Sequence, residues 1–361
     1  MSHSNFFMAL VLAVLYALAR VQPTEENYLW LLPFLIPGVL ALNLLLVLWA
    51  LVRRKLSGVY YLVALGIGAP YLASTLPWKG FVHRPPPSAQ SFSVLNYNVS
   101  LTGFPYVQDW AFYAPPPLAF QLKDWILQQN ADVQCYQEFM TFDGDKNFDM
   151  LHRFKEKGYQ YYFSADIKQP HYPVVGILIV TKFPILKTGD VAVSENGFNR
   201  VAFADVLAGT DTVRIIGVHL QSMGLKQYDP SKAWDLPSAF AKVGLILNQL
   251  KTGMQDRRVQ VEKLKAFIQG SPHPVICVGD FNDLPYSYAY QALKKDLNNT
   301  FEEAGSGFGF TYNGNTLRTL RIDNQFHSHR VQALQFKTLN AVGYTDHFPL
   351  LGTYSITPSR P

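Results

Sequence analysis

The chain has 361 residues, of which 48% are hydrophobic and only 16% are charged, against roughly 25% charged in an average soluble domain. The formal net charge of +5 is concentrated at the start, because six basic and two acidic residues precede residue 85 and leave 25 basic and 24 acidic residues for the remainder. A nearly neutral remainder excludes the strong basic field that drives non-specific nucleic-acid binding.

Three apolar segments open the chain and predict transmembrane helices at residues 5–21, 28–52 and 59–76. A bilayer core needs about 20 mainly apolar helical residues, and these segments are apolar on all sides rather than on one face. The first could instead be a signal peptide cleaved after Ala19, although residues 1–5 carry no Lys or Arg. Burial of all three as core helices of a soluble domain is the other alternative.

The short loops predict the orientation of these helices. Arg53, Arg54 and Lys55 lie between the second and third segments, whereas the first loop carries Glu25 and Glu26. Positively charged loops stay in the cytoplasm, so we expect everything after the third helix on the outer side. The predicted organisation is therefore a membrane anchor at 1–84, a stiff proline-rich linker at 85–90 and a second domain at 91–361.

The second domain alternates short β-rich runs with helical ones. Strands are predicted at 92–97, 133–136, 174–180, 201–206, 213–217, 275–278 and 332–338. Helices are predicted at 120–129, 148–156, 236–269 and 286–295, and Gly253 could break the third of these. This alternation favours an α/β sandwich. Cys135 and Cys277 each lie inside an apolar run, which predicts buried thiols rather than a disulfide or a metal site.

Polar side chains stand at the ends of several predicted strands, where α/β folds usually carry their chemistry. They are Asn98, Glu138, His219, Asp280 with Asn282, Asp323, and Asp346 with His347. Taken singly, each has a structural reading as a cap, an Asx turn, a buried histidine or a surface ion pair. Oxygen-rich groups of this kind suit Mg²⁺ or Mn²⁺. Such a cation with an adjacent His or Asp would serve phosphate-ester hydrolysis.

The order of these residues resembles that of the endonuclease/exonuclease/phosphatase superfamily, which includes pancreatic deoxyribonuclease, abasic-site endonucleases, neutral sphingomyelinases and inositol-polyphosphate 5-phosphatases. The segments 279–282 (Gly-Asp-Phe-Asn) and 346–347 (Asp-His) are the most specific pieces, and the resemblance covers about residues 91–354. It implies a four-layer α/β sandwich. With its apolar helices, the whole chain resembles the membrane-anchored branch common in Bacteroidetes-type bacteria, which implies a multi-pass protein of the bacterial inner membrane.

The resemblance also implies a role for each site residue. The metal site would be formed by Asn98, Glu138 and Asp346. Catalytic roles would fall to His219, Asp280, Asn282, Asp323 and His347. Asp280 would orient or deprotonate the attacking water, Asn282 would bind a phosphate oxygen, and Asp323 would hold the tautomer of His347. The choice of general base among His219, Asp280 and His347 stays open.

Two segments depart from the family pattern. Asn324 and Gln325 stand where an aromatic residue usually follows Arg-Ile-Asp, and residues 171–176 replace a small polar start of a strand. Both leave the expected metal ligands in place and bear on the shape of the substrate pocket. Arg200 would clamp a phosphate or form a structural salt bridge.

We expect a hydrolase of phosphodiesters or phosphomonoesters, with a lipid bilayer as partner and a lipid head group as the favoured substrate. A metal-dependent endonuclease or exonuclease is the first alternative, and an inactive membrane-bound binding module is the second. Aromatic side chains follow Phe104 in an unusual loop and would form a lip in the bilayer interface or a packed satellite cluster. They are Tyr106, Trp110, Phe112 and Tyr113.

Overall fold

The computed structural model describes residues 3–24, 28–77, 91–105, 114–165, 173–193, 197–222, 236–314 and 320–357. Several expected features lie outside these residues: the acidic loop at 25–26, the proline linker at 85–87, the aromatic loop residues at 106–113 and the departure that begins at His171. Phe104 and Phe120, which flank that loop, pack on Phe148, with ring centroids 4.9 and 5.1 Å away.

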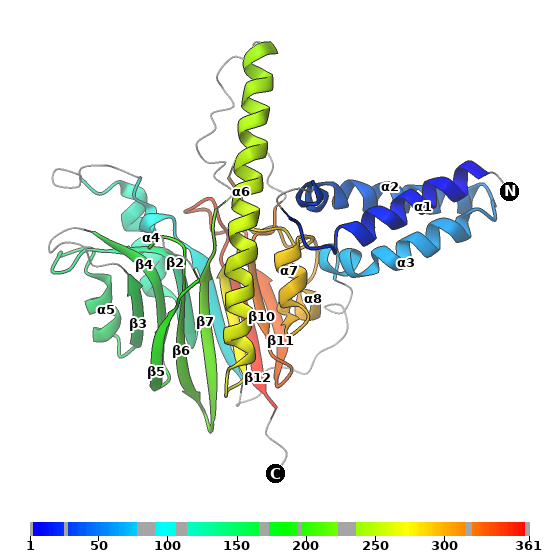
Figure 1. Cartoon of the computed structure of the whole chain (residues 1–361). Helices are drawn as coiled ribbons and strands as arrows, with labels where there is room; N and C mark the ends of the chain where they lie inside the picture. The colour runs from blue at the N-terminus through cyan, green and yellow to red at the C-terminus, as the bar shows by residue number, and fades with distance from the viewer. Residues whose placement is uncertain are drawn as a thin grey trace.

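The N-terminal part folds as a bundle of three helices that projects from the rest of the protein (Figure 1). They are α1 (His3–Leu18), α2 (Leu32–Val52), which follows the short η1 (Leu29–Leu31), and α3 (Gly58–Thr75). Tyr16, Ile36 and Tyr61 are buried between them. The side-chain amide of Asn43, a buried polar residue of α2, lies 3.4 Å from Tyr16 Oη of α1, and in its satisfied orientation it donates to Tyr61 O over 3.0 Å and accepts from Leu65 N over 3.1 Å, so polar contacts inside the bundle join α2 to both neighbours.

The expectation of three transmembrane helices needs correction. Among the described residues, only the helical stretch Leu29–Val52 is both long and apolar enough to cross a membrane. With 16 residues, α1 is shorter than the roughly 20 that a bilayer core requires, and α3 is diluted by glycine, serine and threonine. Only 28% of the most apolar part of α2 is buried, so α2 is not enclosed as the core helix of a soluble protein would be.

Two six-stranded sheets form the second domain. The first sheet has the order β11 (Val331–Thr338), β12 (Leu350–Ile356), β1 (Phe92–Asn98), β2 (Val133–Thr141), β4 (Val174–Thr181) and β3 (Gln160–Ala165). The second has the order β5 (Ile185–Val191), β6 (Arg200–Ala208), β7 (Asp211–His219), β8 (Val275–Asp280), β10 (Asp323–His327) and β9 (Asn298–Asn299). The pairs β1–β2 and β7–β8 are parallel, and the other pairs are antiparallel.

The sheets stack face to face with helices outside, which confirms the predicted α/β sandwich (Figure 1). Ile177 of the first sheet and Ile215 of the second belong to the buried layer between the sheets. The strands β2 and β8, which carry the free cysteines Cys135 and Cys277, also contribute side chains to this layer. Outside the first sheet lie α4 (Pro117–Gln128) and α5 (Met150–Glu156). The second sheet is covered by α6 (Leu236–Gln269) and α7 (Tyr288–Leu293), and the short α8 (Thr300–Ala304) lies beside β11.

The helix bundle is fastened to the sandwich at the C-terminal end of α3. Ser74 Oγ donates to Glu302 Oε1 over 2.5 Å, and Thr75 Oγ1 lies 3.0 Å from Tyr286 Oη. A continuous apolar cluster, here called the junction cluster, spans the bundle and the sandwich and includes Trp30, Tyr71, Leu250, Met254, Leu284, Tyr286 and Ile322. The junction cluster therefore touches the chain immediately after residues 279–283 and immediately before Asp323.

Candidate functional site

One end of the second sheet carries a row of polar residues at matching register. Arg200 pairs with His219, His219 pairs with Asp280, and Asp280 pairs with Asp323. Four neighbouring strands, β6, β7, β8 and β10, thus present one residue each at the same level. Each of these residues stands at a strand terminus. The sheet therefore fixes the backbone of the residue, while its polar side chain lies at the end of the sheet rather than in the apolar core.

The first sheet contributes Asn98 and Glu138 to the same place. Asn98 Nδ2 donates to Glu138 Oε1 over 3.1 Å and to Asp280 Oδ2 over 3.0 Å, so one amide links carboxylates from both sheets. Its Oδ1 accepts the backbone N–H of Ser100 over 3.0 Å. Asn98 therefore orients two carboxylates in this structure.

Glu138 occupies a strained backbone conformation. Its φ is +49°, and the pairing of β2 with β4 shifts register between Tyr136 and Phe139. A bulge of this kind re-aims a side chain, and a positive φ at a residue other than glycine costs of order 1–3 kcal/mol. Strain of this kind is typical of functional positions, and here it turns the Glu138 carboxylate towards the space between the sheets' ends.

Asp280 is fixed by the turn that follows β8. Its Oδ1 accepts the backbone N–H of Asn282 over 2.8 Å, and Asn282 itself has a φ of +51°. Asn282 Nδ2 donates one of its two hydrogens to Leu220 O over 3.0 Å, which leaves the second hydrogen for another acceptor. The residue before Asp280 must be glycine, because Gly279 has a φ of +140° and an added Cβ would collide with the carbonyl oxygen of Val218.

Substitution Gly279→Ala is expected to destabilise the domain by more than about 1 kcal/mol, since the backbone conformation and the space both exclude a side chain. The control is Gly343→Ala, where φ is not positive and a Cβ meets nothing within 4 Å. Thermal denaturation of the purified variants measures both. Equal midpoints for the two variants would show that the 279–282 turn tolerates another geometry.

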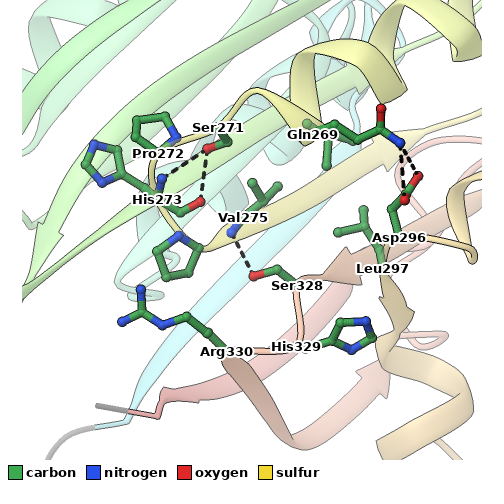
Figure 2. A pocket seen from close by; sticks show the side chains of 12 residues that line it. Gln269, Ser271, Pro272, His273, Val275, Asp296, Leu297, Ser328, His329 and Arg330 are labelled. Carbon is green, nitrogen blue, oxygen red and sulfur yellow. Dashed lines mark hydrogen bonds between the residues drawn. The ribbon is translucent and has the colours of Figure 1, made fainter. Parts of the chain in front are cut away.

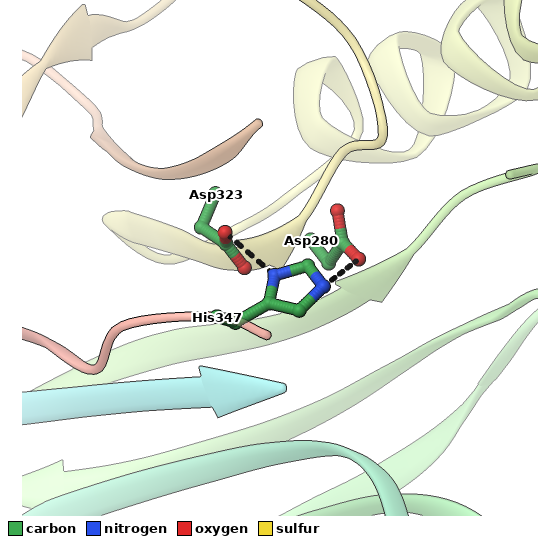
Figure 3. Close-up of side chains that lie close together, drawn as sticks. All are labelled: Asp280, Asp323 and His347. Atoms are coloured by element: carbon green, nitrogen blue, oxygen red, sulfur yellow. Dashed lines mark hydrogen bonds and ion pairs between the residues drawn. The ribbon is translucent and has the colours of Figure 1, made fainter. Parts of the chain in front are cut away.

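His347 forms a buried ion pair with Asp323 (Figure 3). His347 Nδ1 lies 2.9 Å from Asp323 Oδ2, and its Nε2 lies 3.8 Å from Asp280 Oδ2 and 3.9 Å from Asp346 Oδ1. Burial alone would lower the pKa of His347, but the Asp323 and Asp280 carboxylates outweigh it and raise the pKa to about 10. The two carboxylates thus favour the protonated ring, in which Nδ1–H is donated to Asp323 and Nε2–H faces Asp280.

Acid should inactivate the site through Asp323. Burial raises the pKa of this carboxyl to about 6, although His347 opposes the shift. Below that pH Asp323 takes up a proton and loses its charge, so it no longer holds His347, and kcat/KM is expected to fall. In Asp323→Asn the group that titrates is gone, so the rate should be lower at every pH and the limb near pH 6 should disappear. A pH–rate profile that keeps the same limb in Asp323→Asn would contradict this assignment.

His219 approaches the carboxylates from the opposite side. Its Nδ1 lies 3.2 Å from the carbonyl oxygen of Phe198, which requires a proton on Nδ1. Its Nε2 lies 3.6 Å from Glu138 Oε1 and 4.0 Å from Asp280 Oδ2. The carbonyl of Phe198 thus selects the orientation in which His219 Nε2 faces the site.

Seven of the residues expected from the sequence come together, and Asp346 borders them. These seven are Asp280 and the six residues around it: Asn98, Glu138, His219, Asn282, Asp323 and His347. Asp346 is at the rim, where its side chain is one-quarter exposed. Arg200 shares the strand-end row but turns aside, since its guanidinium donates to Gly197 O and, over 3.0 Å, to Ser164 Oγ.

The structure adds two hydroxyl residues that the sequence reasoning missed. Thr311 Oγ1 accepts the backbone N–H groups of Ile322 and Asp323, each over 3.0 Å. Thr345 Oγ1 accepts from His347 N and lies 3.1 Å from Asn98 O, so it ties the 345–347 loop to the end of β1. Thr345, two residues before His347, was recognisable as a Ser/Thr turn, whereas Thr311 carries no local signal.

The donor set fits a hard divalent cation. Glu138 and Asp280 share one amide donor, and within the described residues neither carboxylate has an ion pair with lysine or arginine. Two adjacent carboxylates repel each other, and oxygen ligands are those that Mg²⁺ prefers. Glu138, with Asp346 at the rim, would hold the ion beside Asp280, and Asp280 itself forms with Asp323 and His347 a group whose ligand atoms are close enough to hold a metal.

A shallow pocket lies away from this cluster, at the opposite end of β8 (Figure 2). It is lined by the start of the strand at Val275 and by His273, Asp296 and Arg330, whereas Asp280 ends the strand. The loops there are closed by their own hydrogen bonds, such as that from Val275 N to Ser328 Oγ. The catalytic chemistry therefore belongs to the cluster at the Asp280 end of β8.

The chain is similar to several solved structures at low sequence identity. Solved structures that resemble the chain include a humanised D. rerio TDP2 with 14 mutations, at 15% identity and a TM-score of 0.50 over 74% of this chain and 100% of that one. The human Nocturnin catalytic domain matches at 16% identity and a TM-score of 0.49, over 74% of this chain and 95% of that one. An endonuclease/exonuclease/phosphatase family protein from Bacteroides thetaiotaomicron matches at 18% identity and a TM-score of 0.47, over 75% of this chain and 96% of that one. A search of curated proteins finds no significant match.

A model of the Endonuclease/Exonuclease/phosphatase family matches residues 97–347. The match begins at the end of β1, one residue before Asn98, and ends at His347, so it contains every residue of the cluster. Members of this family are metal-dependent hydrolases of phosphoric esters. This match agrees with the sandwich fold and with the cluster at the strand ends. The chain belongs to the endonuclease/exonuclease/phosphatase family and is a metal-dependent phosphoester hydrolase.

Proposed function

We propose that the protein is a membrane-bound Mg²⁺- or Mn²⁺-dependent phosphoesterase that cleaves a phosphate ester presented at the bilayer surface, in a lipid head group. The observation that carries this proposal is the contact between the helix bundle and the chain segments that flank the catalytic cluster. Ile322, which precedes Asp323, and Leu284 belong to the junction cluster with Tyr71 of α3. Tyr312 packs on the same cluster, and its ring lies 5.2 Å from that of His347.

Each side chain of the cluster has a distinct part in the proposed reaction. Asp280 orients the attacking water, because its carboxylate is fixed by Asn282 and Asn98. The imidazolium of His347 and the remaining N–H of Asn282 donate to the phosphate oxygens. His219 Nε2, on the other side of Asp280, exchanges a proton with the leaving group. A divalent cation held by Glu138 would neutralise charge on the phosphoryl oxygens.

Attachment to the membrane is proposed through α2, because within the described residues only the stretch Leu29–Val52 is long and apolar enough to span a bilayer. Large apolar side chains point outward along all three helices, for example Phe7 at 66%, Leu45 at 63% and Val63 at 61% exposed. The basic residues 53–55 lie between α2 and α3, at the end opposite to the junction with the sandwich. If α3 returns through the bilayer beside α2, the positive-inside rule predicts this loop in the cytoplasm of a bacterial cell and the sandwich on the outer side of the inner membrane.

Protease added to intact spheroplasts tests this orientation. The sandwich should be degraded while the 53–55 loop stays protected, and a protected sandwich would reverse the assignment.

Hydrolysis of nucleic acid is the alternative activity for the same site. The nearly equal numbers of basic and acidic residues after residue 84 give no general attraction to a polyanion. The test is a panel of a phospholipid, an inositol phosphate, a nucleotide and plasmid DNA, each incubated with the full chain in vesicles under Mg²⁺, Mn²⁺ or EDTA. Release of the lipid head group at the highest kcat/KM is expected, and preferential nicking of DNA would replace the lipid proposal with the nuclease.

A further inference from the structure

Helix α6 extends far beyond the sheet that it covers. Its 34 residues give a length of about 50 Å at 1.5 Å per residue, and only the C-terminal half contributes to the core against the second sheet, through Val261, Leu264 and Ile268. The N-terminal half rises past the sheets beside the end of the helix bundle and runs crosswise to α1–α3 (Figure 1).

The N-terminal half carries a single apolar stripe. Val243, Ile246, Leu247, Leu250 and Met254 recur at intervals of three and four residues, which places them on one face of the helix. The opposite face carries polar residues, among them Asn248 and Thr252, with Leu245 as its apolar exception. This pattern is that of a helix with one face in an apolar environment.

Only the C-terminal part of the stripe is covered. Leu250 and Met254 are 8% and 5% exposed within the junction cluster, and Ile246 packs against its edge. One turn further, Val243 and Leu247 are 45% and 37% exposed. The exposed part is thus a direct continuation of a surface that already packs against the membrane-proximal end of the protein.

With α2 across the bilayer as proposed above, the junction cluster lies at the level where the bundle leaves it. The end of α3 at Ser74 and Thr75 touches the sandwich there, and Trp30 at the start of the apolar stretch is buried in the same cluster. Tryptophan is enriched at membrane–water interfaces. A helix that starts at this level and runs crosswise to α2 runs along the bilayer surface.

We propose that the N-terminal half of α6 lies in the bilayer interface, with Val243 and Leu247 among the acyl chains and Asn248 and Thr252 facing water. The occupant of the exposed stripe is the lipid bilayer. This inference rests on the proposed insertion of α2, because the bilayer plane is defined by that helix. It adds a second membrane contact, on the side of the sandwich that carries the catalytic cluster.

Fluorescence quenching in vesicles tests the proposal on the full chain. Single cysteines at Val243→Cys, Leu247→Cys, Asn248→Cys and Thr252→Cys are labelled with an environment-sensitive dye, and Leu45→Cys reports on α2. Cys135 and Cys277 are fully buried, and burial raises the pKa of both thiols, so they compete poorly for the label. The probe is a phosphatidylcholine vesicle with doxyl-labelled lipids.

The expected result is a blue-shifted emission and loss of intensity for the labels at 243, 247 and 45, with no change at 248 and 252. Quenching at 45 without quenching at 243 and 247 overturns the α6 proposal while the insertion of α2 stands. Equal quenching at all four α6 positions overturns the one-sided contact. No quenching at 45 overturns the membrane insertion itself, and the α6 proposal with it. Disulfide-linked dimers of Val243→Cys, with no lipid quenching, would assign the stripe to a second copy of the chain.

Discussion

Replacement of Glu138 by glutamine is expected to lower phosphoester hydrolysis by about 100-fold or more, the range of a lost essential group in a hydrolytic site. Glutamine keeps the shape of the side chain and an oxygen that accepts from Asn98 Nδ2, which lies 3.1 Å from Glu138 Oε1. It removes the negative charge that would hold the cation. The readout is kcat/KM on the best substrate of the phosphoester panel at saturating Mg²⁺.

The same variant should fold as well as the wild-type protein. Without metal, Glu138 adds repulsion to Asp280 and sits on a strained backbone, so loss of its charge should leave the melting temperature unchanged or higher. Mg²⁺ should raise the melting temperature of the wild-type protein by mass action and not that of Glu138→Gln. The matched control is Glu156→Gln, a 63% exposed carboxylate on α5, which should change neither property. Near-native turnover in Glu138→Gln would refute the assignment.

Asp280→Asn is expected to cost about 10²- to 10⁴-fold in kcat, the range for a group that moves a proton in the transition state. Asp280 lies between two histidines, with Oδ2 3.8 Å from His347 Nε2 and 4.0 Å from His219 Nε2. An amide at this position keeps the turn contact with Asn282 N but removes the charge that both rings face. Single-turnover hydrolysis measures the chemical step directly.

A buried carboxylate remote from the cluster serves as the control for Asp280→Asn. Asp205 pairs with Arg214 over 2.7 and 2.8 Å, and both are buried. Asp205→Asn breaks this pair, which should cost about 3–5 kcal/mol of stability and leave the turnover of the folded protein unchanged. Comparable loss of turnover in both variants would mean that the effect at Asp280 is general destabilisation rather than chemistry.

Much of the sandwich was predictable because its central strands are apolar. All seven predicted strands form, and the 236–269 helix runs without a break through Gly253, which is buried. The missed strand β10 shows the limit of hydrophobic patterning. Its residues Asn324 and Gln325 are buried and polar, and Gln325 Nε2 donates to Asn96 Oδ1 over 2.8 Å across the two sheets. A strand whose polar groups are satisfied by the opposite sheet has no apolar alternation to detect. The edge strand β5 was missed for the simpler reason that it is half exposed.

The positions of the site residues at strand ends predicted that they meet in one place. The residues that hold them there could not be predicted from the sequence. Asp280 and His347 stand out in the sequence, since Asp280 ends an apolar strand and His347 follows a turn shortly before another strand. The contact of Thr311 with Asp323, and that of α3 with Glu302 and Tyr286, depend on segments that are distant in sequence and meet only in the folded chain. The number of membrane-spanning helices was overestimated because apolar composition does not fix where a helix ends, and α1 and α3 are shorter or less apolar than their segments suggested.

Binding of Mn²⁺ measured by the loss of the free-ion electron paramagnetic resonance signal tests the central claim, which is that Glu138 holds a hard cation beside Asp280. The wild-type chain should remove Mn²⁺ from solution, and Glu138→Gln should bind it at least about tenfold more weakly, since even residues that only support metal ligands change affinity by 10–100-fold. Glu156→Gln should bind as the wild type does. Equal Mn²⁺ affinity in the wild-type protein and Glu138→Gln would contradict the proposed metal site.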